Sequence, residues 1–298
     1  MLKKIIKNKK GLIFGFFGFL ILANFLIWTS VFSKAESRFL RVYFFDVGQG
    51  DAIFIETPGN NQILIDGGPT DRIMEKLGRT MPFYDHSIDL IILTHPHADH
   101  VSGLINVLKN YEVKMILMSD VSYNTAEYQE FLRLVKEKNI PVIFAEPMRW
   151  RLSSGVILDI LNPAQDLQGI SLKNVHDGAV VGQLKYGRNI FLLTSDIEEN
   201  IEKQLVLAYG DSLNSDILKV GHHGSKTSSS PEFLKTVSPK ISVISTGRKN
   251  RYGHPHQITL DRLREIGSQI FRADLDGDIE IKSNGDIMEI DLSRNNFR

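Results

Sequence analysis

The stretch LTHPHADH at residues 93–100 places four metal-ligand side chains within six consecutive positions. It follows the apolar run LIIL at residues 90–93, which is typical of a buried strand. The ligands therefore lie at the carboxyl end of a strand, where open α/β sheets place their sites. Imidazoles alternating with a carboxylate suit Zn²⁺ or Mn²⁺, and the stretch offers donors for two ions. The chain has only nine histidines, so a chance cluster in a polar loop is a weak alternative.

Five further segments accompany this stretch along the chain. They are FDVGQGD at 45–51, LIDGG at 64–68, LLTSDIE at 192–198, VGHHGSK at 220–226 and YGHP at 252–255. With the HxHxDH pattern they resemble, in order, the motifs of the metallo-β-lactamase superfamily. The similarity is strongest to the extracytoplasmic domain of ComEC-type competence DNA-uptake proteins, over roughly residues 39–291. This resemblance implies an α/β fold, an αββα sandwich of two similar halves.

The resemblance also implies most of the metal ligands. His95 and His97 are expected to hold one ion, Asp99 and His100 the second, and Asp196 is expected to bridge both. Two ions about 3.5–4 Å apart can activate water and clamp a phosphate together. No residue of the chain then has to act as a covalent nucleophile. The resemblance makes Asp99 and Asp196 part of the catalytic machinery as well as ligands.

The neighbourhood of Asp196 departs from the family pattern. The family usually has Thr-Gly-Asp here, whereas this chain has Ser195 in place of the glycine. A serine restricts φ, so the local backbone geometry is in question. Asp196 also precedes a predicted helix, and a helix N-cap is an alternative or additional role for it.

Three histidines have less certain assignments. His222 matches the last ligand of the second metal ion, and His223 is then free to contact the substrate, stabilise a leaving group or orient a ligand. The sequence alone does not separate the two, and we favour His222 as the ligand. His176 is the only histidine between residues 100 and 196. It could complete the shell of the first ion or could be a surface turn residue.

Other residues are expected around the ions. Asp66 matches a carboxylate that orients metal-bound histidines through hydrogen bonds, and Asp46 is expected to lie near it. Alternatively, both aspartates are turn residues next to glycines. His254 and Lys226 are the best candidates to meet a phosphate or to complete its protonation.

The first 34 residues differ from the rest of the chain. Five lysines between residues 3 and 10 precede the uncharged run from Gly11 to Phe32. Such a run is long enough to cross a hydrocarbon core of about 30 Å, and the lysines predict a cytoplasmic N-terminus. We therefore expect a single-pass membrane anchor at residues 1–35 and an extracytoplasmic hydrolase domain at 36–298. A signal peptide cut after Ala35, which would release a secreted enzyme, is the alternative.

Charge and composition narrow the functional classes. The chain has 35 basic and 35 acidic residues and no cysteine, which excludes disulfides and thiolate metal sites. Because six basic residues lie in the first 34 positions, the remainder carries 29 minus 35, or about −6. An acidic domain is not the profile of a DNA-binding module. However, seven basic residues against one acidic residue between Lys219 and Arg251 could form a positive rim, or could be scattered solvated side chains.

The remaining pattern alternates short apolar strands with amphipathic helices. Strands are predicted at 39–46, 52–56, 62–66, 90–94, 113–118, 141–144, 156–161, 179–186, 189–194, 215–220, 240–246, 270–273, 278–282 and 287–291. Helices are predicted at 99–109, 124–138, 197–209, 231–237 and 257–267, with Gly210 ending the third. The acidic segment 274–278 predicts a hairpin turn rather than a calcium loop, because Gly285 occupies the twelfth position.

These features favour an outward-facing hydrolase with two divalent ions, Mn²⁺ or Zn²⁺, that acts on phosphodiesters and most plausibly on DNA strands. The resemblance supplies the DNA-uptake context, and a chain with one membrane segment would need a separately encoded channel as a partner. The same motifs also resemble secreted phosphoesterases of this fold that act on surface polymers or small molecules. A third possibility is a metal-stabilised scaffold without activity. The paired ligand motifs argue against it.

Overall fold

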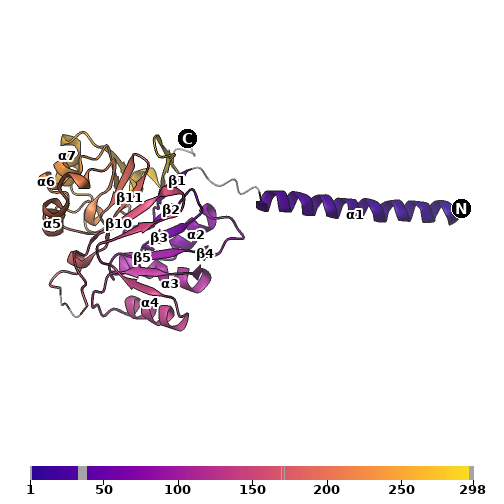
Figure 1. Ribbon diagram of the computed structural model, residues 1–298, viewed down its shortest axis with the longest axis horizontal. Coiled ribbons are helices and arrows are strands. Elements are labelled where there is room, and N and C mark those ends of the chain that lie inside the picture. Colours follow the sequence, from indigo (N-terminus) through magenta and orange to yellow (C-terminus); the bar gives the residue numbers. More distant parts are fainter. Residues whose placement is uncertain (1, 33–38, 169, 171, 295–298) are drawn as a thin grey trace. The chain divides into compact units, whose positions relative to one another are not determined.

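A computed structural model describes residues 2–32, 39–168, 170 and 172–294 (Figure 1). The chain divides into two compact units, Met1–Ser37 and Arg38–Arg298. In the first unit, helix α1 (Leu2–Phe32) exposes apolar side chains between Ile13 and Trp28. Among the described residues, no helix is long and apolar enough to cross a membrane. The expected anchor is therefore unconfirmed and stays a prediction, and its expected boundary at residues 35–36 lies outside the described residues.

The second unit contains two large sheets. The first comprises β1 Leu40–Phe44, β2 Ile53–Glu56, β3 Gln62–Ile65, β5 Leu90–Leu93, β7 Ile116–Met118, β8 Val142–Phe144, β16 Ile279–Ser283 and β17 Met288–Leu292. Its strand order is β17–β16–β1–β2–β3–β5–β7–β8. The strands from β3 to β8 are parallel, whereas the other neighbours are antiparallel. The sequence from β3 to β8 therefore places several strand carboxyl ends at one edge.

The second sheet has the same character. It comprises β9 Met148–Arg151, β10 Ile157–Asn162, β11 Val181–Tyr186, β12 Asn189–Leu193, β13 Ile217–Lys219, β14 Ile241–Ile244 and β15 Gln269–Arg272. The order is β15–β14–β13–β12–β11–β10–β9, and β12 to β15 are parallel. The described residues also form a small parallel pair of β4 (Ser87–Ile88) and β6 (Glu112–Val113).

Helices cover the outer faces of the two sheets (Figure 1). One group contains α2 Arg72–Thr80, α3 Ala98–Asn110 and α4 Ala126–Glu137, and the other α5 Glu199–Tyr209, α6 Pro231–Val237 and α7 Gln257–Glu265. Each group shares an apolar core with the sheet beneath it. A third core, including Phe44, Ile55 and Phe191, joins strands of both sheets. The layers are therefore α, β, β, α, which confirms the expected sandwich.

Most predicted elements are present, including all fourteen strands and the glycine that ends α5. Helix α2 escaped prediction because only Ile73 and Leu77 of its nine residues are buried. Strand β9 escaped because it lies at a sheet edge, with only partial burial. The predicted hairpin at 274–278 was wrong. Strands β15 and β16 belong to different sheets, and the short helix α8 (Ala273–Asp276) lies between them.

Candidate metal centre

A cleft of about 290 Å³ gathers the motif residues of both halves. We call it the metal cleft; its lining residues are Gln49, His97, Ala98, Asp99, Tyr123, His176, Asp196, His222, His223, Tyr252 and His254. The first sheet supplies residues that follow β5, and the second supplies residues that follow β12 and β13. Parallel strands in each sheet bring these segments to corresponding edges. The cleft is therefore built at the junction of the two halves.

One group of ligand atoms consists of three imidazoles. His95, His97 and His176 each place one ring nitrogen within 4.8 Å of the others. His95 Nε2 lies 3.2 Å and His176 Nε2 lies 3.1 Å from His97 Nδ1. Burial lowers the pKa of His95 well below its ordinary value, and burial lowers the pKa of His176 to about 4. Three neutral, converging imidazoles are suited to share one cation.

A second group combines imidazoles with carboxylates. It consists of Asp99, His100, Asp196 and His223, whose ligand atoms also lie within 4.8 Å of one another. His100 Nε2 and His223 Nε2 approach the same oxygen, Asp196 Oδ2, at 3.3 and 3.2 Å. Asp99 Oδ2 lies 3.4 Å from His223 Nε2. The two groups are adjacent, because the rings of His95 and His100 are only 4.0 Å apart.

Outer hydrogen bonds orient the histidines of the second group. His100 Nδ1 lies 2.7 Å from Asp66 Oδ2, and His223 Nδ1 lies 2.8 Å from the carbonyl oxygen of Ser245. A carbonyl can only accept, so it holds a proton on Nδ1 of His223 and directs Nε2 toward Asp99 and Asp196. Metal-binding histidines are commonly oriented in this way.

Buried polar atoms without a well-formed hydrogen bond show that these residues fit divalent metal ions. Within the described part of the chain, buried His223 Nε2 and Asp196 Oδ1 make no hydrogen bond of good geometry, although His223 Nε2 lies 3.2 Å from Asp196 Oδ2. Burying such atoms without a partner is costly, and native proteins rarely do so without an unseen ligand. Burial would lower the pKa of His223, yet Asp196 and Asp51 outweigh it and raise that pKa well above its usual value. The local negative charge therefore favours a cation.

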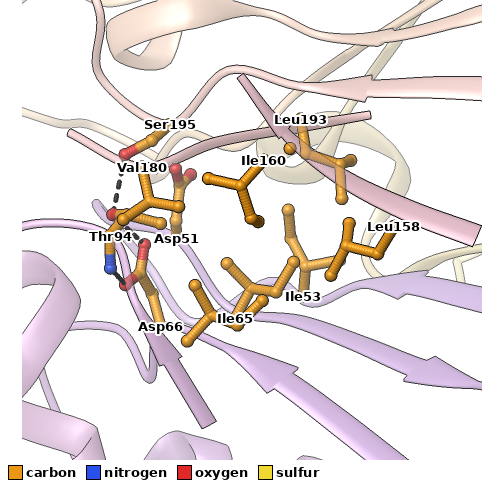
Figure 2. A pocket seen from close by; sticks show the side chains of 12 residues that line it. Asp51, Ile53, Ile65, Asp66, Thr94, Leu158, Ile160, Val180, Leu193 and Ser195 are labelled. Atoms are coloured by element: carbon orange, nitrogen blue, oxygen red, sulfur yellow. Dashed lines mark hydrogen bonds between the residues drawn. The ribbon is translucent and has the colours of Figure 1, made fainter. Parts of the chain in front are cut away.

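Asp66 braces the site from behind, as the sequence predicted for its position (Figure 2). It accepts from Thr94 N at 2.9 Å and from Thr94 Oγ1 at 2.7 Å. Ser195 Oγ donates to Thr94 Oγ1 at 2.7 Å, which ties the second half to the first. Figure 2 shows these bonds beside a cavity of about 10 Å³ between the sheets, which has room for about one water molecule. That cavity is too small for a substrate.

The backbone at Ser195 has the geometry that the family's glycine would supply. Its φ is +49°, in the left-handed region that favours glycine. The serine keeps this conformation while its hydroxyl donates to Thr94. Compared with glycine, it adds backbone strain and gains a hydrogen bond. Asp196 is not a helix cap, because α5 begins at Glu199 after the cap residue Glu198.

The expected position of Asp46 was wrong, and Asp51 lies in its place. Asp46 Oδ2 pairs with Arg294 at 2.8 Å, and no metal-ligand candidate is among its described partners. Asp51 Oδ1 instead lies 3.5 Å from His223 Nδ1. Asp51 also forms an ion pair with Lys219, a fully buried lysine that lies 3.6 Å from Asp196. The sequence signal for Asp51 was its place in the same glycine-rich turn.

The preference for His222 over His223 also needs correction. His223 belongs to the group around Asp196, whereas His222 lies near His176 and Glu198. Both residues have positive φ, +46° and +55°, and this turn places His223 inside and leaves His222 half-buried at the rim. His222 Nδ1 lies 3.2 Å from Glu198 Oε1. Glu198 was missed, although it stands two positions after Asp196 in the quoted motif.

Of the two residues expected to contact a phosphate, His254 lies at the metal cleft and Lys226 does not. His254 lines the metal cleft, and burial lowers its pKa to about 4, so its ring is neutral. Lys226 is exposed and is not part of the cleft lining. The 3₁₀ turn Gly221–Gly224 ends before Lys226, so Lys226 is outside the turn that carries His222 and His223. Tyr123 and Gln49 line the cleft without having been predicted.

A four-layer sandwich with histidines and aspartates of both halves in one cleft defines the class of β-lactamase-fold metal-site proteins. The family model of the metallo-beta-lactamase superfamily matches residues 45–248, and the chain belongs to that superfamily. Among solved structures, the metallo-beta-lactamase fold protein YhfI from Bacillus subtilis is similar with a TM-score of 0.54, at 13% identity over 82% of this chain and 100% of that chain. The metallo hydrolase Igni18 from Ignicoccus hospitalis has a TM-score of 0.53, at 13% identity over 81% of this chain and 98% of that one. These likenesses support the fold.

Curated relatives confirm the resemblance to ComEC-type competence proteins. ComE operon protein 3 of Bacillus subtilis is 29% identical over 261 residues, which are 80% of this chain and 32% of that protein. Competence protein ComA of Neisseria gonorrhoeae is 30% identical over 79% of this chain and 31% of its own length. Recombination protein 2 of Haemophilus influenzae is 28% identical over 99% of this chain and 35% of its length. The chain spans about a third of these relatives.

Proposed function

We propose that this protein is a metal-dependent phosphodiesterase that degrades DNA strands in connection with DNA uptake. The observation that carries the proposal is the pairing of two ligand groups in one cleft, three imidazoles beside a group of two aspartates and two histidines. Paired divalent sites of this kind serve in-line displacement at phosphorus. The competence names of the curated relatives supply the DNA context.

The residues that would hold the ions follow from the two groups. His95, His97 and His176 would hold one ion, and Asp99, His100 and His223 the other. Asp196 belongs to the second group, where its Oδ2 lies 3.3 Å from His100 Nε2, and it would be a ligand there. When bound, the ions would supply Lewis-acid activation of water and neutralise phosphoryl charge. The donor set contains no sulfur, so it suits Mn²⁺ or Zn²⁺.

The protein's own contribution is to position the ligand side chains and to hold protons on them. Asp66 and the Ser245 carbonyl fix the rings of His100 and His223 before a substrate arrives. Such preorganisation avoids a reorganisation cost during the reaction. At the rim, Glu198 holds Nδ1 of His222, which leaves the opposite ring nitrogen for a phosphoryl or leaving-group oxygen.

The proposed setting is the outer face of the cell membrane. The lysine-rich start and the apolar run of α1 support a single-pass anchor with the catalytic unit outside, or release of that unit by signal-peptide cleavage. A DNA-uptake channel is the proposed partner, because a curated relative is named competence protein ComA.

The test uses the full chain in detergent, stripped with EDTA and reconstituted separately with Mn²⁺ or Zn²⁺. Labelled single-stranded DNA and a small chromogenic phosphodiester serve as substrates. Asp196→Asn should reduce cleavage of both at least 100-fold, while Asp211→Asn, a change at an exposed aspartate, should behave like wild type. Cleavage of the small ester but not of DNA would favour a surface-polymer or small-molecule esterase. Equal activity of Asp196→Asn and wild type would refute the proposed centre.

A further inference from the structure

We propose that a second cleft beside the metal cleft binds the phosphate backbone of a single-stranded nucleic acid. This cleft has a volume of about 540 Å³, and we call it the arginine cleft. Its lining includes Gln49, Thr70, Arg72, Arg248, Asn250 and Arg294. The inference rests on the proposed function, because it names the substrate that this cleft would guide to the metal centre.

The charge of the arginine cleft suits a polyanion. Arg72 and Arg248 are exposed and have no carboxylate partner among residues 39–168 and 172–294. Arg294 is neutralised by Asp46 at 2.8 Å. The cleft therefore keeps two uncompensated guanidinium groups, in a unit whose overall charge is acidic. Arginine forks bind phosphate oxygens in pairs of hydrogen bonds, so two such groups match two phosphates of a strand.

The arginine cleft and the metal cleft share Gln49 as a lining residue. Gln49 Oε1 accepts from Gly247 N at 3.1 Å and from Thr246 Oγ1 at 3.2 Å. A Cβ at Gly247 would lie 2.6 Å from Gln49 N, so the two loops touch backbone to backbone. This contact fixes the position of Gln49, which borders both clefts. A strand held by Arg72 and Arg248 would pass over Gln49 to the metal ligands.

An exposed aromatic ring stands on the same path. Tyr252 is 51% exposed, lines the metal cleft and stacks against His254 at 5.7 Å. The guanidinium of Arg251 lies 5.0 Å from the centre of its ring. A positive groove with an aromatic platform is the usual arrangement for binding unpaired bases, because every base has a face that can stack. This feature favours a single strand over a duplex.

The placement also resolves the basic segment that the sequence singled out. Lys219 is fully buried and cannot be part of a positive rim. Lys240 pairs with Asp216, and neither residue lines the arginine cleft or the metal cleft. Arg248 and Arg251 lie in the loop that borders both clefts. Of the basic segment, Arg248 and Arg251 therefore contribute to a positive rim. Arg72, from the other half, is a further member.

The experiment measures binding and cleavage separately with the full chain in detergent. The probe is a labelled 12-nucleotide single strand with phosphorothioate linkages, which keep the charge and slow cleavage. Arg72→Gln combined with Arg248→Gln should weaken binding about 10- to 30-fold at 0.1 M salt. It should also reduce the salt slope by about 1.4, because each phosphate contact on a single strand contributes about 0.7. The matched control, Arg133→Gln with Arg188→Gln, removes two exposed arginines elsewhere and should bind like wild type.

Three results would overturn the inference: unchanged binding and slope in the Arg72 and Arg248 variant, equal loss in the control, or equal binding of a peptide nucleic acid of the same sequence. Tighter binding of duplex than of single strand would overturn the assignment to a single strand. Wild-type hydrolysis of the small phosphodiester reports on the proposed function independently. Strand binding that depends on the arginines without any hydrolysis would leave the arginine cleft supported and refute the catalytic proposal.

Discussion

Replacing Lys219 by methionine would disturb the buried charges behind the metal cleft. Lys219 is 0% exposed, donates to the Ser195 carbonyl oxygen at 2.8 Å and forms an ion pair with Asp51. Burial would lower the pKa of Lys219, but the carboxylates of Asp51 and Asp196 outweigh it and raise that pKa above its usual value. The ammonium is therefore charged, and both carboxylates depend on it.

Removing one partner of a buried ion pair costs about 3–5 kcal/mol, because the other charge stays buried and unpaired. Such a loss is a large part of the 5–15 kcal/mol that stabilises a typical domain. With a urea slope of about 3 kcal/mol/M, the unfolding midpoint of Lys219→Met should fall by about 1–1.7 M. Adding Asp51→Asn should restore at least about 2 kcal/mol, because the main unpaired charge is then gone.

The assay is urea unfolding of the full chain in detergent, followed by near-ultraviolet circular dichroism with EDTA present. Wild type, the two single variants and the double variant form one cycle. If the two single losses simply add in the double variant, Lys219 and Asp51 are not coupled and the charge-balance reasoning is refuted. A loss below about 1 kcal/mol for Lys219→Met would refute it equally, because that is the range of an exposed pair.

Three further predictions follow from single contacts. Burial raises the pKa of Glu202 from 4.5 to about 7, so the folded state holds its proton more tightly than the unfolded state does. The free energy of unfolding should therefore fall by about 3 kcal/mol as pH rises from 4.5 to 7 and then level off. Urea titrations at several pH values should show a flatter profile for Glu202→Gln. Asp66→Asn should weaken metal affinity 10- to 100-fold by calorimetry, because it frees the ring of His100, whereas equal weakening by Asp46→Asn would contradict the placement of Asp46 beside Arg294. Ser195→Ala and Ser195→Gly both lose the bond to Thr94, but only alanine is strained at the positive φ, so Ser195→Ala should be about 1 kcal/mol less stable than Ser195→Gly in thermal unfolding; the reverse order would show that backbone strain does not decide this position.

Local signals predicted a cluster of ligand side chains at the end of one strand, and the family resemblance predicted the sandwich. An apolar run of strand length followed by clustered histidines specifies both an element and the end at which its ligands lie. The resemblance then placed Asp196 and the Gly221–Gly224 turn in the other half. In the fold, His95 and His97 lie between β5 and α3, and Asp99 and His100 lie in the first turn of α3.

The sequence could not predict the directions of the His222 and His223 side chains or the distant ion-pair partners of Asp46 and Asp51. Two consecutive residues with positive φ decide that His223 rather than His222 faces Asp196, and no local pattern specifies this for histidines. Asp46 and Asp51 flank the same turn, but the C-terminal Arg294 draws the first away while Lys219 holds the second. Such pairings join segments that are more than a hundred residues apart.

The cleft's position between the sheets has an energetic consequence. Neither half contains a complete ligand group, because Asp196 and His223 come from the second sheet while Asp99 and His100 come from the first. The geometry of the centre therefore depends on how the apolar core between the sheets packs, and a shift of the sheets would separate the ligands. Conversely, an ion that binds only the assembled cleft stabilises the packed sandwich by mass action. Metal binding and the packing of the two sheets are thus thermodynamically coupled. The hydrogen bond between Ser195 and Thr94 also connects the two halves and needs no metal.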